Sequence, residues 1–536
     1  MINPLNDVGH ATVSVAAILA ETAARLPNKT AIIVGEQSIS YSQLWTETKA
    51  YAGGLDALGI RPGDPVAVLI PNVADFPRVY YAVLALGGIV VPIHALLKAE
   101  EIAFVLKDSG ARLLVCSAPL LPEGAKGAAL AGVDVVSLMV PSVVPEGAPA
   151  ALLDALAFDR LEDVAASATP IETFLPRQPN DTATILYTSG TTGAPKGAEG
   201  SHFSLVEQTS TLLLGTFDLT AADTILGCLP LFHTFGQTCV LNTGFRAGAT
   251  IVLMPKFDGQ AALSLIQEHD CTLFFGVPTM YMVLLTALKG TTGVVSKLRY
   301  GVSGGAALPV AIIDKFRDAF GVEIHEGYGL TETSPVACFN QRGMEPRAGT
   351  IGTPIWGVDV EIADAEIEGI IKLLPRGELG EIVIRGHNIM KGYLNRPEDT
   401  AEAIVDGWFR TGDLGTKDDE DYIRILDRKK DMILRNGYNV YPREVEEVLA
   451  RHPGVAMAAV YGVAHELHGQ EIVGAVVLVA DSEVTPAELI AFAQERVAAY
   501  KYPREILVLP ALPMGPSGKV LKRELVAAYK PSALAE

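Results

Sequence analysis

The chain has 536 residues, of which 49% are apolar and 19% charged, and its formal net charge is −20. This length exceeds what one hydrophobic core usually supports, so we expect more than one domain. The acidic balance, without an extended Lys/Arg cluster, excludes general nucleic-acid binding, because neutralising phosphates requires a basic surface.

Strand-like apolar runs alternate with helical patterns through most of the chain, which is typical of parallel sheets covered by helices on both faces. The expected strands include residues 66–70, 89–91, 250–254 and 272–275, and a helix is expected at 76–86. An uncharged run at 79–97 is long enough to be considered as a membrane span. Gly87, Gly88 and Pro92 interrupt it, so a buried helix end, a turn and a strand are predicted instead.

Cysteine usage and the N-terminal sequence point to one compartment. The five cysteines lack paired spacing, which argues against a disulfide framework or a Cys-based zinc module and suits a reducing cytosol. No basic stretch followed by an apolar one marks a secretory signal at the N-terminus. We therefore expect a cytoplasmic protein without a transmembrane segment.

A glycine-rich string follows the strand-like residues 184–186 and reads Thr188-Ser189-Gly190-Thr191-Thr192-Gly193-Ala194-Pro195-Lys196-Gly197. Its glycines let the backbone approach a ligand closely, and its hydroxyl and amide groups can donate to several phosphate oxygens. Lys196 adds a positive charge. The string predicts a polyphosphate cradle that differs from the P-loop, which needs Gly-Lys-Ser/Thr at the start of a helix. The alternative interpretation is a flexible surface loop.

A second string, EGYGLTETSP, covers residues 326–335. The glycines on both sides of Tyr328 allow its ring to be presented to a flat ligand, while Thr331 and Glu332 supply a hydroxyl and a carboxylate. A carboxylate beside a phosphate site makes most sense with a bridging cation. Mg²⁺ fits because it takes few protein ligands together with phosphate oxygens.

The pattern changes to short strands and turns from about residue 351 to 385, where strands are expected at 358–362 and 381–385. A small β-rich subdomain is predicted there. A glycine-rich string at 407–415 then contains Asp413, which can accept hydrogen bonds from ribose hydroxyls. Five consecutive charged residues at 427–431 predict either a solvated turn or a domain junction.

The last hundred or so residues have a compact α+β pattern, with helices expected at 442–451 and 486–499 and strands at about 457–461 and 472–479. Near the C-terminus, Pro516-Ser517-Gly518-Lys519 places one lysine in a tight turn. Taken alone, this string and the string around Asp413 are more typical of plain turns.

Six strings in this order carry a family resemblance: TSGTTGAPKG, LPLFHTFG, EGYGLTETSP, GWFRTGD, DRKKDMI and PSGK. The chain resembles the adenylate-forming superfamily of acyl-CoA synthetases, adenylation domains and beetle luciferases, and is most similar to bacterial fatty-acyl-CoA ligases, over residues 39–523. This resemblance implies an α/β fold, with a large N-terminal domain of two α/β sheets plus a β-barrel subdomain and a small mobile α+β C-terminal domain. The domains would span 1–429, with the β-rich part at about 351–429, and 430–536, with the hinge near Lys430.

The resemblance also implies an activity, ATP-dependent acyl-CoA ligation. A medium- or long-chain fatty acid would be activated as acyl-AMP with release of pyrophosphate, and coenzyme A would then form the thioester, with ATP and Mg²⁺ required. An aryl or other carboxylate is the nearest alternative, and transfer of the acyl group to a carrier protein or an amine is another. Luciferase-like light emission is less supported. A non-enzymatic lipid-binding or scaffold protein would be expected to have lost Lys519 or Glu332, and both are present.

Site residues follow from the match to the strings of this superfamily. Lys519, Thr331, Glu332 and His233 would be catalytic, and Thr188 and Glu332 would bind Mg²⁺. The residues expected to bind ATP and AMP are Thr188, Ser189, Gly190, Thr191, Thr192, Gly193, Lys196, Gly305, Glu326, Gly327, Tyr328, Asp413 and Arg428. The residues expected at the acyl and CoA pocket are His233, Val277, Gly304, Gly437 and Asn439. On its own, His233 in an apolar run is more typical of a core histidine.

Two departures from related enzymes stand in the sequence. Hydroxycinnamate enzymes and luciferases have a second lysine four residues beyond the hinge, where this chain has Leu434; whether the neighbouring Arg435 substitutes is open. Phe235-Gly236-Gln237 lacks the tryptophan gate of some long-chain enzymes, which does not exclude fatty acids. A homodimer is a further hypothesis. So is a lysine acetylase acting on Lys519, because acetylation would remove the charge that the first step needs.

Overall fold

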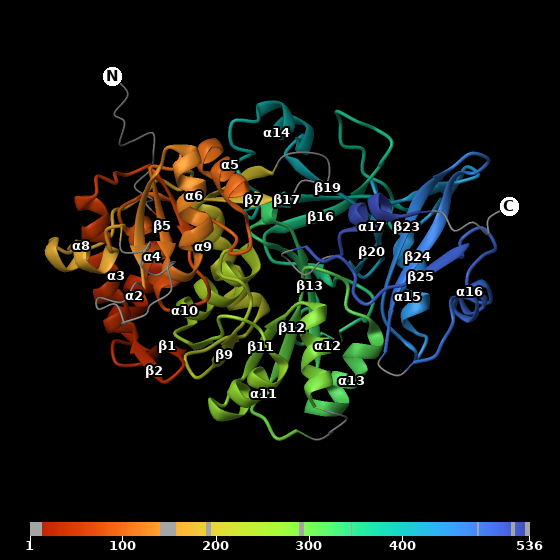
Figure 1. Cartoon of the computed structure of the whole chain (residues 1–536), viewed down its shortest axis with the longest axis horizontal. Helices are drawn as coiled ribbons and strands as arrows, with labels where there is room; N and C mark the ends of the chain where they lie inside the picture. Colours follow the sequence, from red (N-terminus) through yellow and green to blue (C-terminus); the bar gives the residue numbers. More distant parts are fainter. Residues whose placement is uncertain are drawn as a thin grey trace.

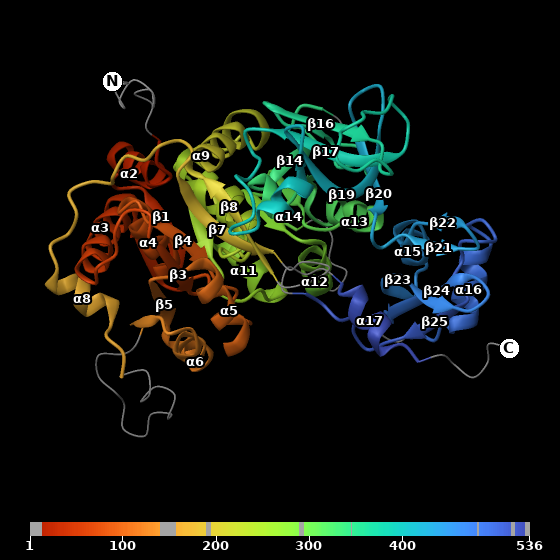
Figure 2. The ribbon, with the colours of Figure 1, turned by 90° about the horizontal axis from the view of Figure 1, so that it is seen from above.

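The computed structural model describes residues 13–139, 157–188, 195–288, 294–344, 346–479, 482–515 and 520–530. The strands of these residues form four sheets, three in the N-terminal part of the chain and one in the C-terminal part (Figure 1). Helices flank the sheets, and the C-terminal sheet stands beside the others (Figure 2). This arrangement confirms the predicted mixed α/β fold class.

A six-stranded sheet has the order β6-β5-β3-β4-β7-β8 and is parallel except for its β7–β8 pair. Its inner strands are almost wholly apolar and buried, as expected for strands covered on both faces. The strands are β3 (Pro65–Leu69), β4 (Ile89–Pro92), β5 (Leu113–Ser117), β6 (Asp134–Leu138), β7 (Thr182–Thr188) and β8 (Lys196–Ser201). The helices in this stretch are α3 (Tyr41–Ala57), α4 (Asp75–Ala85), α5 (Ala99–Ser109), α6 (Leu121–Ala131) and α8 (Leu161–Ser167).

A nine-stranded sheet has the order β15-β14-β13-β12-β11-β9-β10-β1-β2, with parallel strands from β13 to β1. Its strands are β1 (Thr30–Val34), β2 (Gln37–Ser40), β9 (Thr224–Gly227), β10 (Thr250–Leu253), β11 (Leu273–Gly276), β12 (Tyr300–Ser303), β13 (Ile324–Gly329), β14 (Val336–Phe339) and β15 (Thr353–Pro354). Its helices are α2 (Ala16–Arg25), α9 (His202–Thr211), α10 (Thr243–Ala247), α11 (Gly259–Glu268), α12 (Pro278–Ala287) and α13 (Val310–Phe320). Two π-helical turns, η2 (Leu212–Thr216) and η3 (Phe235–Asn242), lie between α9 and α10.

The third sheet is antiparallel, with β20 paired to β19, and falls where a β-rich stretch is predicted. It consists of β16 (Val358–Ala363), β17 (Gly380–Gly386), β18 (Ile404–Val405), β19 (Trp408–Lys417) and β20 (Ile423–Arg428), with α14 (Pro397–Ala403) before β18. The C-terminal sheet consists of β21 (Ile433–Arg435), β22 (Tyr438–Val440), β23 (Val455–His465), β24 (Gly469–Leu478) and β25 (Glu505–Val508). Its helices are α15 (Pro442–Ala450), α16 (Pro486–Gln494) and α17 (Lys522–Ala528).

The helix expected at 486–499 ends at Gln494, five residues early. Beyond it, the Arg496 N–H donates to the Ala493 carbonyl, which closes a tighter turn than the helix makes. Tyr500 and Tyr502 then pack against the core of the C-terminal sheet. The expected helix was too long because apolar residues continue the helical spacing after Gln494. In the structure, Tyr500 and Tyr502 make their core contacts from beyond the end of the helix.

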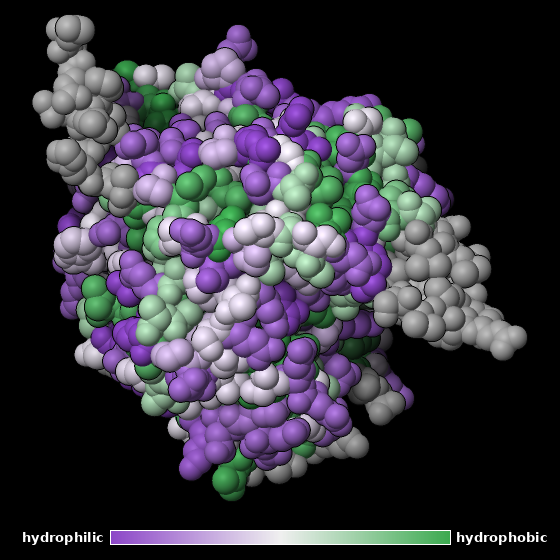
Figure 3. All heavy atoms as spheres, turned by 90° about the vertical axis from the view of Figure 1, so that its left-hand side faces the viewer, coloured by the Kyte–Doolittle hydropathy of each residue, from purple (hydrophilic) through white to green (hydrophobic). Residues whose placement is uncertain are grey.

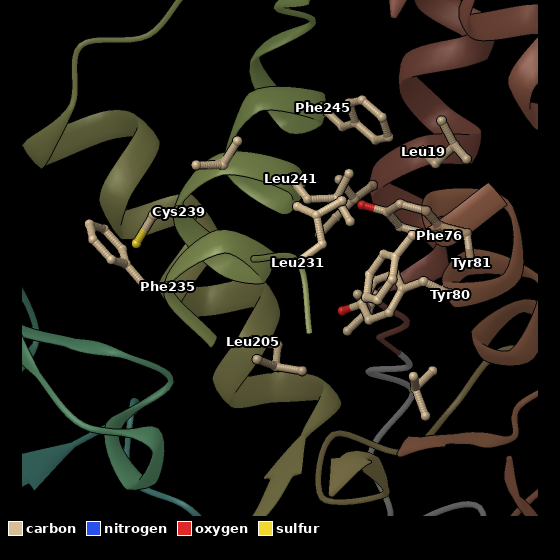
Figure 4. Packing of buried hydrophobic residues seen from close by; sticks show 14 of the residues in the cluster. Leu19, Phe76, Tyr80, Tyr81, Leu205, Leu231, Phe235, Cys239, Leu241 and Phe245 are labelled. Carbon is tan, nitrogen blue, oxygen red and sulfur yellow. The ribbon is translucent and has the colours of Figure 1, made fainter. Parts of the chain in front are cut away.

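Helix α4 joins the first two sheets into one core, and the run at 79–97 forms the end of this helix, a turn at Gly87 and β4, as predicted. Residues 79–85 are fully buried, so the helix is covered all round. Its Tyr80 and Tyr81 rings lie beside Phe245 and Leu241 from the η3–α10 segment (Figure 4). The Tyr81 hydroxyl donates to Asn242 Oδ1 over 2.8 Å, which satisfies its polar atom inside the core.

His202 connects α9 to the start of the described chain, because its Nδ1 accepts the Val15 N–H over 3.1 Å. Burial lowers the pKa of His202 to about 4 from its ordinary value of 6.5. Between these pH values His202 is protonated in the unfolded chain but not in the folded protein, so the free energy of unfolding decreases as the pH falls. Relative to His202→Asn, the wild-type free energy of unfolding should decrease by about 1.4 kcal/mol per pH unit from 6.5 to 4. Denaturant titrations of both proteins across this range measure it; parallel curves would contradict it.

None of the helices formed by the described residues combines the length and the hydrophobicity that a membrane span requires. On the face formed by the N-terminal sheets and their helices, apolar residues are interspersed with polar ones (Figure 3).

Candidate functional site

A cleft of about 1970 Å³ lies where the two N-terminal sheets, the third sheet and the C-terminal segment meet. Most of the described residues assigned from the sequence line it: Thr188, Lys196, His233, Val277, Gly304, Gly305, Gly327, Tyr328, Thr331, Glu332, Arg428 and Lys430. The cleft therefore gathers residues that lie up to 242 positions apart in the chain. From the predicted cradle, Ser189, Gly190, Thr191, Thr192 and Gly193 lie outside the described residues, as does Lys519.

Residues at the carboxyl ends of parallel strands line part of this cleft, which is the usual place for ligands in open α/β sheets. Val277 follows β11, Gly304 and Gly305 follow β12, and Gly327 lies at the end of β13. Gly305 has a φ of 83°, which favours glycine. A Cβ on Gly327 would lie 3.0 Å from the Phe339 ring, so the missing side chain leaves room for that ring.

Arg428 and Tyr328 line the cleft and meet at Asp413, which is buried behind them and does not itself line the cleft. Asp413 and Arg428 are register partners on β19 and β20, and the Arg428 Nε–H donates to Asp413 Oδ1 over 3.0 Å. The Tyr328 hydroxyl donates to the other oxygen of the same carboxylate. Burial, followed by the Asp413 charge, raises the pKa of Tyr328 well above its ordinary value, so this hydroxyl stays protonated. A carboxylate held from both sides is suited to accept hydrogen bonds from sugar hydroxyls.

Glu381 holds the part of β19 that carries Asp413, although nothing in the sequence marks it as a site residue. Arg410 donates to Glu381 Oε2 through Nε and Nη2, over 3.0 and 2.6 Å. The Gly412 N–H donates to Glu381 Oε1 over 2.9 Å. This buried ion pair fixes the backbone next to Asp413.

Glu326, which was expected to bind ATP, lies buried in β13 and is not among the residues that line the cleft; its Oε1 accepts the Leu308 N–H over 3.2 Å. Burial raises its pKa to about 7 from an ordinary value of 4.5. The folded protein therefore binds a proton that the unfolded chain releases between these values, and stability falls as the pH rises. Glu326→Gln should raise the free energy of unfolding by about 3 kcal/mol at pH 8, and by little at pH 4.5. Equal stability changes at both pH values in denaturant titrations would contradict this cause.

Thr188 and Lys196 form another part of the cleft wall, where they lie opposite each other as register partners on β7 and β8. Lys196 Nζ forms an ion pair with Asp399 from α14. Close by, the Tyr393 hydroxyl donates to Glu332 Oε1 over 2.8 Å, and Glu332 is 8% exposed. Tyr393 and Asp399 were not selected from the sequence, because nothing in their own segment indicates that they meet Glu332 and Lys196.

The donor set in this part of the cleft fits a magnesium ion. Thr188 offers a hydroxyl, Glu332 a carboxylate, and both line a cleft that also holds Lys196. Mg²⁺ prefers oxygen ligands and usually keeps only one or two carboxylates beside phosphates and waters.

His233 lies on the loop after β9, and its Nδ1 accepts the Phe235 N–H over 3.2 Å. It lines the cleft together with Val277 and Gly304, beside the apolar side chains of Phe217, Phe235, Met280, Val302 and Val336. This part of the cleft can receive an apolar group. Within the described residues, His233 is therefore a cleft residue rather than a core histidine.

Gly437 and Asn439 are not brought to the cleft. They lie at the exposed β21–β22 hairpin, where Asn436 and Gly437 have φ values of 53° and 79°. Next to them, Arg435 donates to both oxygens of Glu471 over 2.6 and 3.0 Å. Arg435 is thus engaged within the C-terminal sheet.

The charged residues 427–431 lie between the third sheet and the C-terminal sheet. Asp427 is buried at the end of β20 and accepts the Arg443 N–H from α15 over 2.8 Å. Residues 429–431 form the turn. The predicted turn is therefore found at the last three residues of the run, of which Lys430 is exposed, whereas the first two residues are packed and paired.

Comparisons with known proteins agree with this geometry. The AMP-binding enzyme model matches residues 19–394, and the AMP-binding enzyme C-terminal domain model matches residues 444–519. A long-chain-fatty-acid–CoA ligase from Bacillus subtilis is 36% identical over 527 residues, covering 95% of this chain and 93% of the relative. A feruloyl-CoA synthase from an Amycolatopsis species is 37% identical over 502 residues, covering 93% and 96%.

Solved structures share the architecture as well. The crystal structure of ATP-bound MatB from Rhodopseudomonas palustris has a TM-score of 0.86 at 30% identity, and the match covers 96% of this chain and 99% of that one. Matching sequence models, relatives and architecture along nearly the whole length lead to one conclusion: the chain belongs to the AMP-binding enzyme family, within the adenylate-forming superfamily.

Proposed function

We propose that the chain is an ATP-dependent acyl-CoA ligase that acts on a medium- or long-chain fatty acid. The observation that carries the proposal is one cleft lined by Lys196 and Glu332, by Arg428 with its buried partner Asp413 behind it, and by an apolar wall beside His233. These parts suit a polyphosphate, a ribose and an acyl chain respectively. The family and its CoA-ligase relatives support the same reaction class.

In the first step, a carboxylate oxygen of the acid attacks the α-phosphorus of ATP, and the bond to the pyrophosphate leaving group breaks. Thr188 and Lys196 would hold the β- and γ-phosphates, and Thr331 would donate to an α-phosphate oxygen. Thr188 and Glu332 would hold Mg²⁺, which neutralises phosphate charge when bound. Fixed donors of this kind stabilise the charge that develops on the α-phosphate.

In the second step, the CoA sulfur attacks the acyl carbon, the thiol proton is lost, and AMP leaves. We propose that the unit beginning near Lys430 rotates between the steps. In the arrangement seen, residues 515 and 520–523 of the C-terminal part line the cleft, while Gly437 and Asn439 lie away from it. A rotation would move the segment around Lys519 out of the cleft and bring the β21–β22 hairpin to it. Lys519 would then act in the first step and the hairpin in the second.

An aryl acid is the second candidate, because a feruloyl-CoA synthase is as similar to this chain as the fatty-acid enzyme is. Pocket size near Val277, Gly304 and Met280 should decide between them. The test is thioester formation with Mg-ATP and CoA across acids from acetate to palmitate, with benzoates and cinnamates. A maximum among aliphatic acids supports the proposal. A maximum among aryl acids replaces the substrate, and acid-dependent pyrophosphate release without CoA thioester would indicate a carrier-protein or amine acceptor.

A cytoplasmic location, a homodimer and acetylation of Lys519 belong to the same proposal as hypotheses. Acetylation would remove the positive charge on Lys519 and so stop the first step. Mass spectrometry of protein isolated from cells grown under several conditions tests it, and a Lys519 unmodified throughout would count against it.

A further inference from the structure

Lys196 already has a carboxylate partner inside the cleft. Its Nζ is paired with Asp399, and it lies 5.2 Å from the centroid of the Tyr393 ring. Both side chains of the pair are about one-third exposed, at 32% and 30%, and both residues line the cleft. The pair therefore lies on the cleft wall, where a ligand can reach the ammonium group.

Backbone pairing fixes the position of Asp399. The segment before α14 runs along β8, where the Lys391 N–H donates to the Glu199 carbonyl over 2.9 Å and the Leu394 N–H donates to the Gly197 carbonyl over 2.8 Å. The Tyr393 N–H then donates to Thr400 Oγ1 of α14 over 2.9 Å. Figure 2 shows α14 beside β7 and β8. Asp399 is thus held next to Lys196 by the fold.

The same segment reaches the magnesium side of the site. Tyr393 places its hydroxyl on Glu332, and its pKa is raised beyond the ordinary range by burial and then by the charge of Glu332, with Asp399 adding to the effect. Lys196 is consequently flanked by the Asp399 carboxylate and by the Tyr393 ring, whose hydroxyl contacts Glu332, in the part of the cleft assigned to polyphosphate. A phosphate group that binds Lys196 must share it with Asp399 or displace Asp399.

We propose that Asp399 is a resident counter-ion that competes with the polyphosphate for Lys196 and so promotes the release of pyrophosphate. The inference rests on the proposed function. An ammonium group carries a single charge, and a carboxylate beside it both occupies donors and repels phosphate oxygens. Asp399 therefore weakens the binding of ATP and of pyrophosphate, and it pairs again with Lys196 once pyrophosphate departs. Asp399 acts through Lys196 and is a positioning residue.

The test is Asp399→Asn, which keeps the size of the side chain and removes its charge. Calorimetry with magnesium pyrophosphate should give a dissociation constant about threefold to thirtyfold lower than in the wild type, the range between exposed and desolvated charge pairs. Product inhibition by pyrophosphate against ATP should strengthen by a similar factor. The KM for ATP should fall while kcat does not rise, which mere loss of structure would not produce.

Three variants sharpen the result. Asp399→Glu keeps the charge and should bind pyrophosphate like the wild type, and Glu402→Gln removes a charge from the same helix and the same cleft wall, so it should change affinity less than Asp399→Asn. Asp399→Ala replaces Asp399→Asn if the latter does not fold. Pyrophosphate binding that is unchanged or weaker in Asp399→Asn, or in Asp399→Ala where that variant is used, overturns the inference. A wild type that binds neither pyrophosphate nor Mg-ATP would instead overturn the proposed function.

Discussion

Lys519→Ala is expected to slow acyl-adenylate formation by about 10²–10³-fold, while thioester formation from supplied acyl-AMP and CoA survives. The family resemblance assigns the Lys519 ammonium group to the carboxylate and the α-phosphate, where negative charge builds up only in the first step. Its nearest described neighbours, Gly515 and Val520, both line the cleft. Pyrophosphate release reports the first step, and AMP release from synthetic acyl-AMP reports the second.

Arg523→Ala is the matched control for Lys519→Ala. Arg523 is an exposed cation that also lines the cleft on the C-terminal side, so its loss removes the same charge from the same region. We expect it to retain most of the adenylation rate. Equal loss of both half-reactions in Lys519→Ala would refute the assignment of Lys519 to the first step. If Arg523→Ala slowed adenylation as much as Lys519→Ala does, the effect of Lys519→Ala would be explained by the loss of any positive charge in this region.

Lys430→Pro is expected to slow thioester formation at least about tenfold more than adenylation, because proline fixes φ and prevents the backbone change that a hinge must absorb. Lys430 lies in the turn between β20 of the third sheet and β21 of the C-terminal sheet. The hydrogen bond from the Arg443 N–H to Asp427 spans this turn and would be affected by any rotation there. Single-turnover rates of the two half-reactions measure the effect.

The control for this variant is Lys430→Ala, which removes the side chain and leaves φ free. Both half-reactions should then proceed at close to wild-type rates. A proline variant that retains both half-reactions would remove Lys430 from the hinge, and an alanine variant as defective as the proline variant would point to the charge of Lys430 rather than to its backbone.

The parts of the site that the sequence could predict are those encoded locally. Tyr328 and Glu332 lie in one continuous string at the end of a strand. The glycines in this string mark positions where a side chain would clash, which can be recognised from the sequence. Asp413 and Arg428 were also selected from their own strings, and the β19–β20 register places them together. The alternation of strands and helices sufficed for the two N-terminal sheets, because parallel sheets need such connections.

The parts that the sequence could not predict depend on contacts between distant segments. Asp399 is 203 residues from Lys196, and Tyr393 is 61 residues from Glu332, and nothing in the sequence around either residue indicates that contact. Glu381 reaches the backbone next to Asp413 through its side chain, from a neighbouring strand 31 residues away from Gly412. The end of α16 was missed for a related reason, because the apolar residues after Gln494 pack in a turn although their spacing continues the helical pattern.

The central claim is that one cleft carries out both half-reactions, and a two-stage single-turnover experiment tests it most directly. The protein is first mixed with Mg-ATP and the preferred acid in the absence of CoA, and CoA is then added while acyl-AMP, AMP and acyl-CoA are followed. The account predicts acid-dependent acyl-AMP with matching pyrophosphate in the first stage, followed by its stoichiometric conversion to AMP and acyl-CoA. The absence of acyl-AMP in the first stage, or acyl-AMP that CoA does not discharge, would contradict it.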